Sequence, residues 1–259
     1  MDKIAAVIVV YNKSLTSSRS FASIGQTEGV KIVVVDNSDP SFDNEQHAQE
    51  MGCRYIGMGY NAGLSRAYNA AINLVVKDAD IVCLFDDDTD VDPNYFDAVR
   101  YYATNLPNCN VFVPVVIDSA GMLSPCTIKG AFCKRAESVA AIPSGGITAI
   151  NSGMAVRTDV FEQYRYDEGQ FLDYVDHAFL RDITGHDKAR ICVMEEIVLH
   201  QQFSGSEKQA KASAKKRYDI FQKDVRYFCN KYGVPKTCCA FLLFKRRLHI
   251  YLQGILRRG

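Results

Sequence analysis

Five aspartates stand within seven positions in the segment LFDDDTDVDP, residues 84–93. Carboxylates this close repel one another, and each raises the pKa of its neighbours. A divalent cation relieves the repulsion, because Mg²⁺ and Mn²⁺ prefer oxygen ligands and commonly bind one or two carboxylates together with substrate phosphate. The alternation of Asp86 and Asp88 therefore favours a metal site. Asp90 and Asp92 are better explained as a solvated loop before a helix.

The aspartates follow the apolar run ADIVCLF, which is typical of a strand buried on both faces. Three similar runs occur, at residues 4–12, 31–38 and 110–118. Segments with helical spacing of apolar residues separate them, so the sequence predicts an α/β fold with a mostly parallel sheet covered by helices on both faces. Ligands bind such sheets at the carboxyl ends of the strands, so we expect Tyr11, Asp36 and Asp86 to meet at one crevice.

The charge of the chain is unevenly distributed. The 259 residues are 47% hydrophobic, enough for a substantial core, and their formal net charge is zero. Residues 208–259 hold 14 Lys and Arg and 2 Asp, a charge of +12, which the rest of the chain balances. We therefore expect a main domain at residues 1–205 and a basic helical extension at residues 206–259.

The basic extension has an apolar helical face surrounded by Lys and Arg, which favours contact with an anionic membrane surface. A helix packed on the domain is the alternative, and no nucleic-acid-binding motif accompanies the tail. No signal peptide is visible, and no apolar run approaches a membrane span. The nine cysteines lack metal-like spacing and suggest reduced thiols. We expect a cytoplasmic protein, peripheral on the inner face of the cytoplasmic membrane where the tail binds lipid.

Seven segments resemble, in order, the motifs of the inverting glycosyltransferases of family 2, which have the GT-A fold. They are VIVVYN, VVVDNS, NAGLSRAYNAAI, LFDDDT, NSGMAVR, FLDYVDHAFLRD and VLHQQFSG, and they extend from about residue 3 to about residue 205. Each motif alone is a weak signal, whereas all seven in order are specific. The resemblance implies transfer of a sugar from a nucleoside diphosphate to an acceptor hydroxyl, with Mn²⁺ or Mg²⁺ as the cofactor.

The resemblance assigns the donor nucleotide to Val10, Tyr11, Asp36, Arg66, Asp86 and Asp87. Asp36 would accept the imide N–H of uracil or thymine, and Arg66, near a helix N-terminus, would favour phosphate. A turn residue and a surface arginine are the structural alternatives. Asp88 would ligate the metal together with His200, which could instead be an ordinary structural histidine. Asp87 lies between the two motif aspartates and is expected to point elsewhere.

The motif FLDYVDHAFLRD matches the segment that supplies the catalytic base, and Asp176 stands at the matching position. Such a base must reach the acceptor hydroxyl within hydrogen-bond distance. On a helix, Asp173 would lie three residues away on the same face, where it would bind acceptor or raise the pKa of Asp176. The family often has Glu-Asp where this chain has Val-Asp, which leaves the supporting role open. The contacts below the sugar would be Asn151, Ser152 and Gly153.

Within the family, the motifs are most similar to bacterial rhamnosyl- and galactofuranosyl-transferases of cell-surface polysaccharides. The donor is expected to be dTDP-rhamnose, with UDP-galactofuranose or another UDP-hexose as the alternative, because Asp-Asp-Asp is closer to the galactofuranosyl pattern. The acceptor is expected to be a glycan, free or carried on polyprenyl diphosphate. A further alternative is a protein with the same fold that does not transfer sugar. It would be a catalytically inactive nucleotide-sugar binder or a scaffold in a polysaccharide assembly complex. A nucleotidyltransferase is disfavoured, because VVYNKSLTSS lacks the glycines of its phosphate loop.

Overall fold

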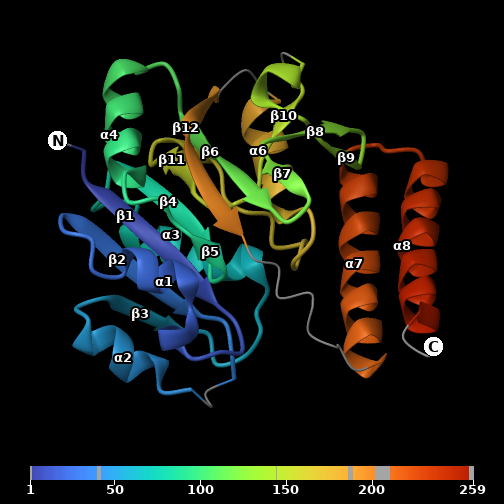
Figure 1. Cartoon of the computed structure of the whole chain (residues 1–259), viewed down its shortest axis with the longest axis horizontal. Coiled ribbons are helices and arrows are strands. Elements are labelled where there is room, and N and C mark those ends of the chain that lie inside the picture. The colour runs from blue at the N-terminus through green and yellow to red at the C-terminus, as the bar shows by residue number, and fades with distance from the viewer. Residues whose placement is uncertain (1, 40–41, 144, 186–188, 202–210, 257–259) are drawn as a thin grey trace.

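The computed structural model describes the chain except residues 1, 40–41, 144, 186–188, 202–210 and 257–259 (Figure 1). A nine-stranded mixed sheet forms the centre, in the order β3-β2-β1-β4-β11-β6-β12-β5, with β7 paired to β6. A second sheet of three strands, β10-β8-β9, lies towards the C-terminal helices. The predicted α/β architecture with a mostly parallel sheet is confirmed.

The first half of the large sheet consists of parallel strands. They are β1 (Ile4–Val10), β2 (Val30–Asp36), β3 (Arg54–Gly57) and β4 (Ile81–Asp86). All seven residues of β1 are buried, and they alternate between two cores. Ala5, Val7 and Val9 face one core, whereas the even-numbered residues face the other. Burial of both faces explains why these strands are continuous apolar runs in the sequence.

Helices cover both faces of this sheet. The face of Ala5 packs against α3 (Leu64–Val75), α5 (Val160–Gln163) and α6 (Val175–Thr184). The opposite face packs against α1 (Arg19–Ile24), α2 (Asn44–Glu50) and α4 (Tyr95–Asn105). Two single-turn helices, Leu15–Ser17 and Val139–Ala141, lie in loops.

Antiparallel strands make the sheet mixed beyond β4. The remaining strands are β5 (Thr89–Asp90), β6 (Val111–Asp118), β7 (Gly121–Ser124), β11 (Met154–Arg157) and β12 (Ile191–Gln201). β11 is inserted between β4 and β6 and is antiparallel to both, while β12 is parallel to β6 and antiparallel to β5. The end of β12 therefore lies beside the turn that carries the aspartate cluster.

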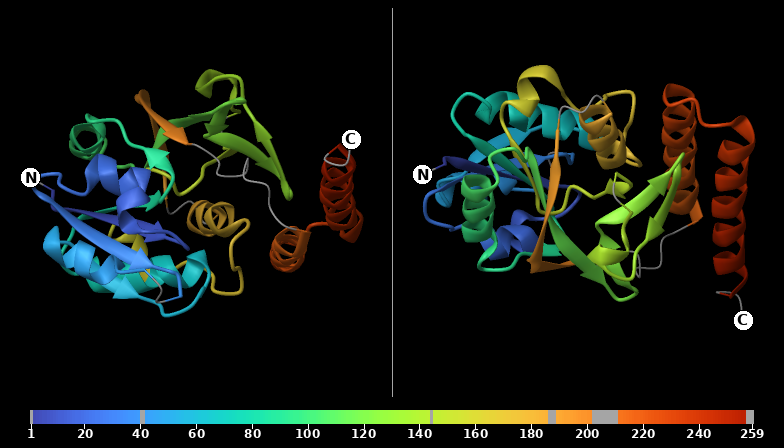
Figure 2. Two further views of the ribbon diagram at one scale, coloured as in Figure 1. Left: turned by 60° about the horizontal axis from the view of Figure 1, so that its bottom comes forward. Right: turned by 90° about the horizontal axis from the view of Figure 1, so that it is seen from above.

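The C-terminal part is a pair of long helices, α7 (Lys211–Lys231) and α8 (Lys236–Leu256), joined by a short turn. α7 lies between α8 and the rest of the molecule (Figure 2). Val225, Phe228 and Cys229 of α7 are buried in a core of their own with Ala131 and Ala178. The expected domain boundary at residue 205 lies outside the described residues. No helix in the described ranges is long and apolar enough to cross a membrane.

The small sheet lies beside this helical pair. It comprises β8 (Cys126–Lys129), β9 (Phe132–Arg135) and β10 (Ile147–Thr148). The ring of Phe132 in β9 lies 6.1 Å from the ring of Phe241 in α8. The sequence did not predict this sheet, because its strands are only two to four residues long.

Candidate active site

The carboxyl ends of β1, β2 and β4 lie side by side, because these strands pair in parallel. Val10 lies opposite Asp36 of β2, and Val9 lies opposite Asp86 of β4. The strand order and register thus bring Tyr11, Asp36 and Asp86 to one edge of the sheet, as the sequence predicts. Ligands of open α/β sheets bind at this edge.

Asp86 is held by two hydroxyl groups. The Tyr68 hydroxyl donates to one carboxylate oxygen at 2.9 Å, and the Ser152 hydroxyl donates to the other at 2.9 Å. Burial, followed by the charge of Asp88, raises the pKa of Asp86 to about 7. A cation beside Asp86 would favour its ionised form, so the site is chemically suited to receive positive charge.

Asp88 faces Gln201 and not His200. The Gln201 Nε2 atom donates to Asp88 Oδ1 at 3.1 Å. In the pairing of β12 with β5, Gln201 lies opposite Thr89 and His200 lies opposite Asp90. Neighbouring side chains of a strand point to opposite faces, so His200, which is exposed, points away from the face where Gln201 meets Asp88. The expected pairing of His200 with Asp88 is therefore not found, and the polar partner is the next residue.

The side chains around Asp88 suit a divalent cation that shares its coordination with phosphate. Asp86 and Asp88 supply carboxylates, and the buried Oε1 atom of Gln201 has no hydrogen-bond partner among the described residues. Hard cations bind carboxylate and amide oxygens, and Mg²⁺ usually completes its shell with water and substrate phosphate. In the described ranges, no three or more His, Cys, Asp or Glu side chains group to hold a metal. These residues thus fit an ion that substrate helps to bind, and not one enclosed by protein ligands.

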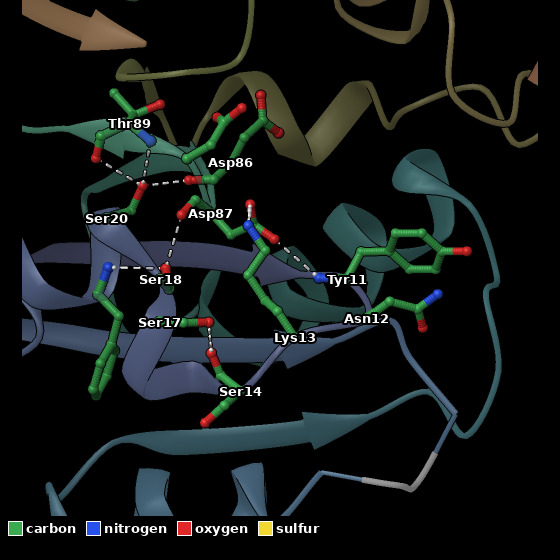
Figure 3. Close-up of polar contacts among 12 residues, drawn as sticks. Tyr11, Asn12, Lys13, Ser14, Ser17, Ser18, Ser20, Asp86, Asp87 and Thr89 are labelled. Atoms are coloured by element: carbon green, nitrogen blue, oxygen red, sulfur yellow. Dashed lines mark hydrogen bonds and ion pairs between the residues drawn. The ribbon is translucent and has the colours of Figure 1, made fainter. Parts of the chain in front are cut away.

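Asp87 points into the loop that follows β1 (Figure 3). One carboxylate oxygen accepts from the backbone N–H of Tyr11 at 3.1 Å, and the other pairs with Lys13 Nζ at 2.8 Å. The Ser18 hydroxyl donates to the backbone carbonyl of Asp87 at 3.1 Å, and Ser20 bonds to the backbone of the same turn. The aspartate turn and the β1–α1 loop are therefore fixed to each other, and Lys13 is brought to the edge of the site.

Asp36 is buried and already has partners in the protein. Its Oδ1 atom accepts from the backbone N–H of Ser38 at 3.1 Å. Its Oδ2 atom accepts from Asn44 Nδ2 at 2.7 Å and from the Tyr55 hydroxyl at 3.2 Å. The side chain thus closes the end of β2, and its contact with a nucleotide base stays a prediction.

The other residues predicted to bind the donor nucleotide lie around the same edge of the sheet. Val10 is fully buried, whereas the Tyr11 side chain is exposed. Arg66 is exposed in the first turn of α3 and forms an ion pair with Glu168, with 3.3 Å between Nε and Oε2. A phosphate at this helix end would therefore compete with Glu168 for the guanidinium group.

Residues 151–153, Asn-Ser-Gly, lie next to Asp86, which the Ser152 side chain contacts. Asn151 accepts from the Tyr166 hydroxyl at 2.6 Å, and Ser152 holds Asp86 as described above. Gly153 has a φ of +79°, and a Cβ there would lie 2.5 Å from Leu199 Cδ1. The protein itself thus fills the space where a side chain would lie, and the contact of Gly153 with a sugar stays a prediction.

Asp173 and Asp176 do not share a helical face. α6 begins at Val175, and Tyr174 before it has a left-handed φ of +63°. Asp173 lies outside the helix, where both terminal guanidinium nitrogens of Arg217 contact its carboxylate. The expectation of a helical pair is wrong, because the chain turns sharply between the two aspartates.

Asp176 lies in the first turn of α6 and keeps a partly exposed carboxylate. Its Oδ1 atom accepts the backbone N–H of His177 at 2.7 Å, and its side chain is 19% exposed. Burial, then the charge of Asp176 and then that of Asp86, raises the pKa of Tyr166. The Tyr166 ring stacks on that of Tyr68 with 5.3 Å between centroids. Asp176 and Asp86 thus both lie near one stacked pair of tyrosines.

Three residues of this site were missed in the sequence: Lys13, Tyr68 and Gln201. Tyr68 belongs to the NAGLSRAYN motif, and its position on the buried face of α3 is the signal that could have indicated a partner for a strand-end aspartate. Gln201 follows His200, and strand alternation makes one of the two face the aspartates. Lys13 had no such signal, because it lies in a loop.

Comparison of the sequence with known proteins identifies the family of the chain. The family model for glycosyl transferase family 2 matches residues 5–165. The chain is 30% identical over 181 residues to the dTDP-rhamnosyl transferase RfbF of Shigella flexneri. That match covers 68% of this chain and 61% of the relative, so this chain corresponds to about three-fifths of the relative's length.

Solved structures share the fold at low identity. The mannosyltransferase PcManGT of Pyrobaculum calidifontis, in complex with GDP-Man and Mn²⁺, has a TM-score of 0.60 at 12% identity, covering 87% of this chain and 64% of that one. The glucosyl-3-phosphoglycerate synthase of Mycobacterium tuberculosis, in complex with Mn²⁺, UDP and phosphoglyceric acid, has a TM-score of 0.59 at 14% identity, covering 90% and 80%. The extent of the family match and this architecture show that the chain belongs to glycosyltransferase family 2 and has the GT-A fold.

Proposed function

We propose that the protein is an inverting glycosyltransferase that moves rhamnose from dTDP-rhamnose to a hydroxyl of a glycan or lipid-linked glycan in cell-surface polysaccharide synthesis. The similarity to a dTDP-rhamnosyl transferase supports this donor. One observation carries the proposal. Asp86 at the end of β4 and Asp176 in the first turn of α6 both lie near one pair of stacked tyrosines, Tyr68 and Tyr166, so that a donor diphosphate and an acceptor base can lie close together.

The donor half of the reaction would use the strand ends. The base of the nucleotide would lie near Val10, Tyr11 and Asp36, and the diphosphate near Arg66 and the aspartate turn. A divalent cation held by Asp88, with the oxygens of Asp86 and Gln201, would supply positive charge that favours departure of the diphosphate. Lys13, which lies against Asp87, adds a second cation at this edge.

The acceptor half would use Asp176. An inverting transfer is a single displacement, in which the acceptor hydroxyl attacks the anomeric carbon from the face opposite the leaving diphosphate. Asp176 would take the proton of that hydroxyl, for which it needs an accessible carboxylate at hydrogen-bond distance. Its partial exposure in the first turn of α6 supports this role. Asn151 and Ser152 would line the floor beneath the sugar.

The proposed function is tested by nucleoside diphosphate release from a panel of dTDP-rhamnose, UDP-galactofuranose and UDP-hexoses, with Mn²⁺ or with EDTA. We expect metal-dependent release of dTDP that is lost in Asp88→Ala. Asp97→Ala is the matched control, because this aspartate lies exposed on α4. Release of UDP alone would identify a UDP-sugar transferase, the alternative that UDP-bound structural relatives support. No release and no calorimetric binding of any donor would contradict a glycosyltransferase.

We also propose that α8 holds the protein at an anionic membrane surface, where a lipid-linked acceptor would be found. The outward face of α8 carries four apolar side chains that are 43–66% exposed: Phe241, Phe244, Leu248 and Tyr251. Lys245 and Arg247 are also exposed, and α8 contains no Asp or Glu. Such a face fits the headgroup region of an anionic bilayer. The nine free thiols support a cytoplasmic location.

Co-sedimentation with vesicles tests this contact. We expect binding to phosphatidylglycerol vesicles, weak binding to phosphatidylcholine vesicles, and loss of binding in the double variant Phe241→Ala with Phe244→Ala. Tyr101→Ala, which removes an aromatic ring that is 64% exposed on α4, is the control. Equal sedimentation of wild type and double variant would contradict membrane contact through α8.

A further inference from the structure

Hydrogen bonds and ion pairs connect α7 to the segment that carries Asp176. This acidic segment, residues 167–182, comprises the loop before α6 and all but the last two residues of that helix. Near its beginning, Asp167 pairs with Lys231 at 2.6 Å. At its end, Asp182 pairs with the same Lys231 at 2.7 Å and accepts from the Tyr232 hydroxyl at 2.7 Å. One helix thus holds both ends of the segment.

The middle of the acidic segment is held by one buried carboxylate. Asp224 of α7 is 1% exposed, and it accepts the backbone N–H groups of three successive residues. These are Phe171 at 2.9 Å, Leu172 at 2.8 Å and Asp173 at 2.8 Å. A buried carboxylate is costly unless it is hydrogen-bonded, and here the turn supplies the donors. The shape of this turn therefore depends on a side chain some fifty residues later in the chain.

A second contact from α7 fixes the same turn from the side. Arg217 forms a bidentate ion pair with Asp173, with 2.7 Å between Nη2 and Oδ1. Bidentate pairs of this kind fix direction as well as distance. Directly after Asp173, the left-handed residue Tyr174 leads into the first turn of α6, where Asp176 lies. The orientation of that first turn is thus set by the contacts on Asp173.

The turn also contacts the loop at the start of α3 on the donor side. The backbone carbonyl of Phe171 accepts the N–H of Leu64 at 2.7 Å, and the Ser65 hydroxyl donates to the carbonyl of Gln170 at 2.5 Å. A Cβ on Gly63 would lie 2.7 Å from the ring of Phe171. Glycine at this position therefore allows the turn to approach the donor loop.

We propose that Asp224 and Arg217 are positioning residues for sugar transfer. They hold the turn at residues 171–173, and through it they set the place of Asp176 relative to the donor loop at residues 62–65. The proposal rests on the proposed transfer with Asp176 as the base. It gives the C-terminal extension a direct part in the reaction, separate from any contact of α8 with a membrane.

The test uses Asp224→Asn in the full chain. The amide keeps the size of the side chain but replaces one acceptor oxygen with a donor group, which faces the N–H groups of the turn. We expect the rate of dTDP release from saturating dTDP-rhamnose with Mn²⁺ to fall about 10- to 100-fold, the effect of a small misplacement of catalytic groups. We also expect hydrogen exchange to accelerate at the amides of residues 171–173 and of Leu64.

Asp219→Asn is the matched control, because it makes the same change of charge at an exposed position of α7. It should leave both the rate and the exchange at wild-type values. All rates are compared well below the melting temperature, where each variant is folded by circular dichroism. A folded Asp224→Asn with a rate within about twofold of wild type would overturn the proposal, since a purely stabilising contact changes only the folded fraction.

Arg217→Met decides the question where Asp224→Asn does not fold. It removes the ion pair at a partly exposed position, and we expect the same direction of change in rate and exchange. Wild-type rate and exchange in this variant would then overturn the proposal. Absence of both nucleoside diphosphate release and donor binding by the wild type would refute the proposed function and not the positioning. Hydrogen exchange at the Leu64 amide then decides. Faster exchange in either variant supports the coupling between the turn at residues 171–173 and the loop at residues 62–65, and unchanged exchange overturns it.

Discussion

The aspartates at the strand ends and the aspartates of the acidic segment are held by different parts of the chain. Asp36, Asp86 and Asp87 are fixed by neighbouring strands, by α3 and by the loop after β1. Asp173 and the turn before it are instead fixed by α7, whose residues come some fifty positions later. The proposed donor half is thus built from parallel strand register, whereas the proposed acceptor half is held by single side chains of a C-terminal helix. A family 2 domain can therefore be completed by an element outside its matched region.

Substitution of Asp176, the proposed base, is expected to give the largest effect, a loss of sugar transfer without a loss of nucleotide affinity. Asp176→Asn removes the group that would take the proton of the acceptor hydroxyl, so sugar transfer should fall about 10²- to 10⁴-fold. Calorimetric affinity for dTDP should stay at the wild-type value, because the donor edge is untouched. A variant that transfers sugar at the normal rate would show that the base lies elsewhere.

The packing of α7 gives the next largest effect. Phe228 is fully buried in the core that joins α7 to α6, so Phe228→Ala should lower the free energy of unfolding by about 3–5 kcal/mol. Phe244→Ala, which truncates a ring that is 64% exposed on α8, should change it by less than about 0.5 kcal/mol. Urea denaturation measures both. Equal and small losses would indicate that α7 is an appendage and not part of the acceptor half.

Substitution of Gly153 tests how closely the chain packs against Leu199 beside the aspartate turn. Gly153→Ala places a methyl group against Leu199 at a positive φ, so we expect a loss of about 1–3 kcal/mol in the free energy of unfolding. Gly52 also has a positive φ, +68°, but a Cβ there meets nothing within 4 Å. Gly52→Ala should cost only the conformational strain, about 1 kcal/mol. Equal losses in urea titrations of the two variants would show that the packing against Leu199 is unimportant.

The smallest effect is expected from the ion pair between Arg135 of β9 and Asp118 of β6, which links the two sheets. The hydrogen bonds from Arg135 hold the pKa of Asp118 below its ordinary value of 3.8. Because the folded pKa is lowered, the pair stabilises the fold above the unfolded pKa and loses its effect as the pH falls through the folded value. Arg135→Met should thus cost less than about 1 kcal/mol at neutral pH and nothing once Asp118 is protonated. A difference that persists in acid would indicate packing and not charge.

The same contrast explains what the sequence could predict. The strands β1, β2, β4 and β6, and the helices α3 and α4, follow from local apolar patterns, and strand register then brings Asp36 and Asp86 together. Gln201, the hydrogen-bond partner of Asp88, was not predicted, because the sequence does not reveal which face of β12 meets the turn. The prediction that Asp173 pairs with Asp176 on one helical face was wrong for another reason. A left-handed residue at Tyr174 breaks the helical pattern, and a bidentate partner in α7 has no local signal.

The pairing of β5 with β12 has a consequence for the order in which the protein is made. The aspartate turn emerges from the ribosome before the strand that pairs with it, which ends at Gln201, 111 residues after Asp90. At typical rates of translation this interval lasts about 5 to 20 s. During that time the nascent chain has its most acidic turn in place without the strand that pairs with it. Completion of the site therefore waits for the synthesis of β12, and a chain truncated before Gln201 cannot display a finished aspartate site.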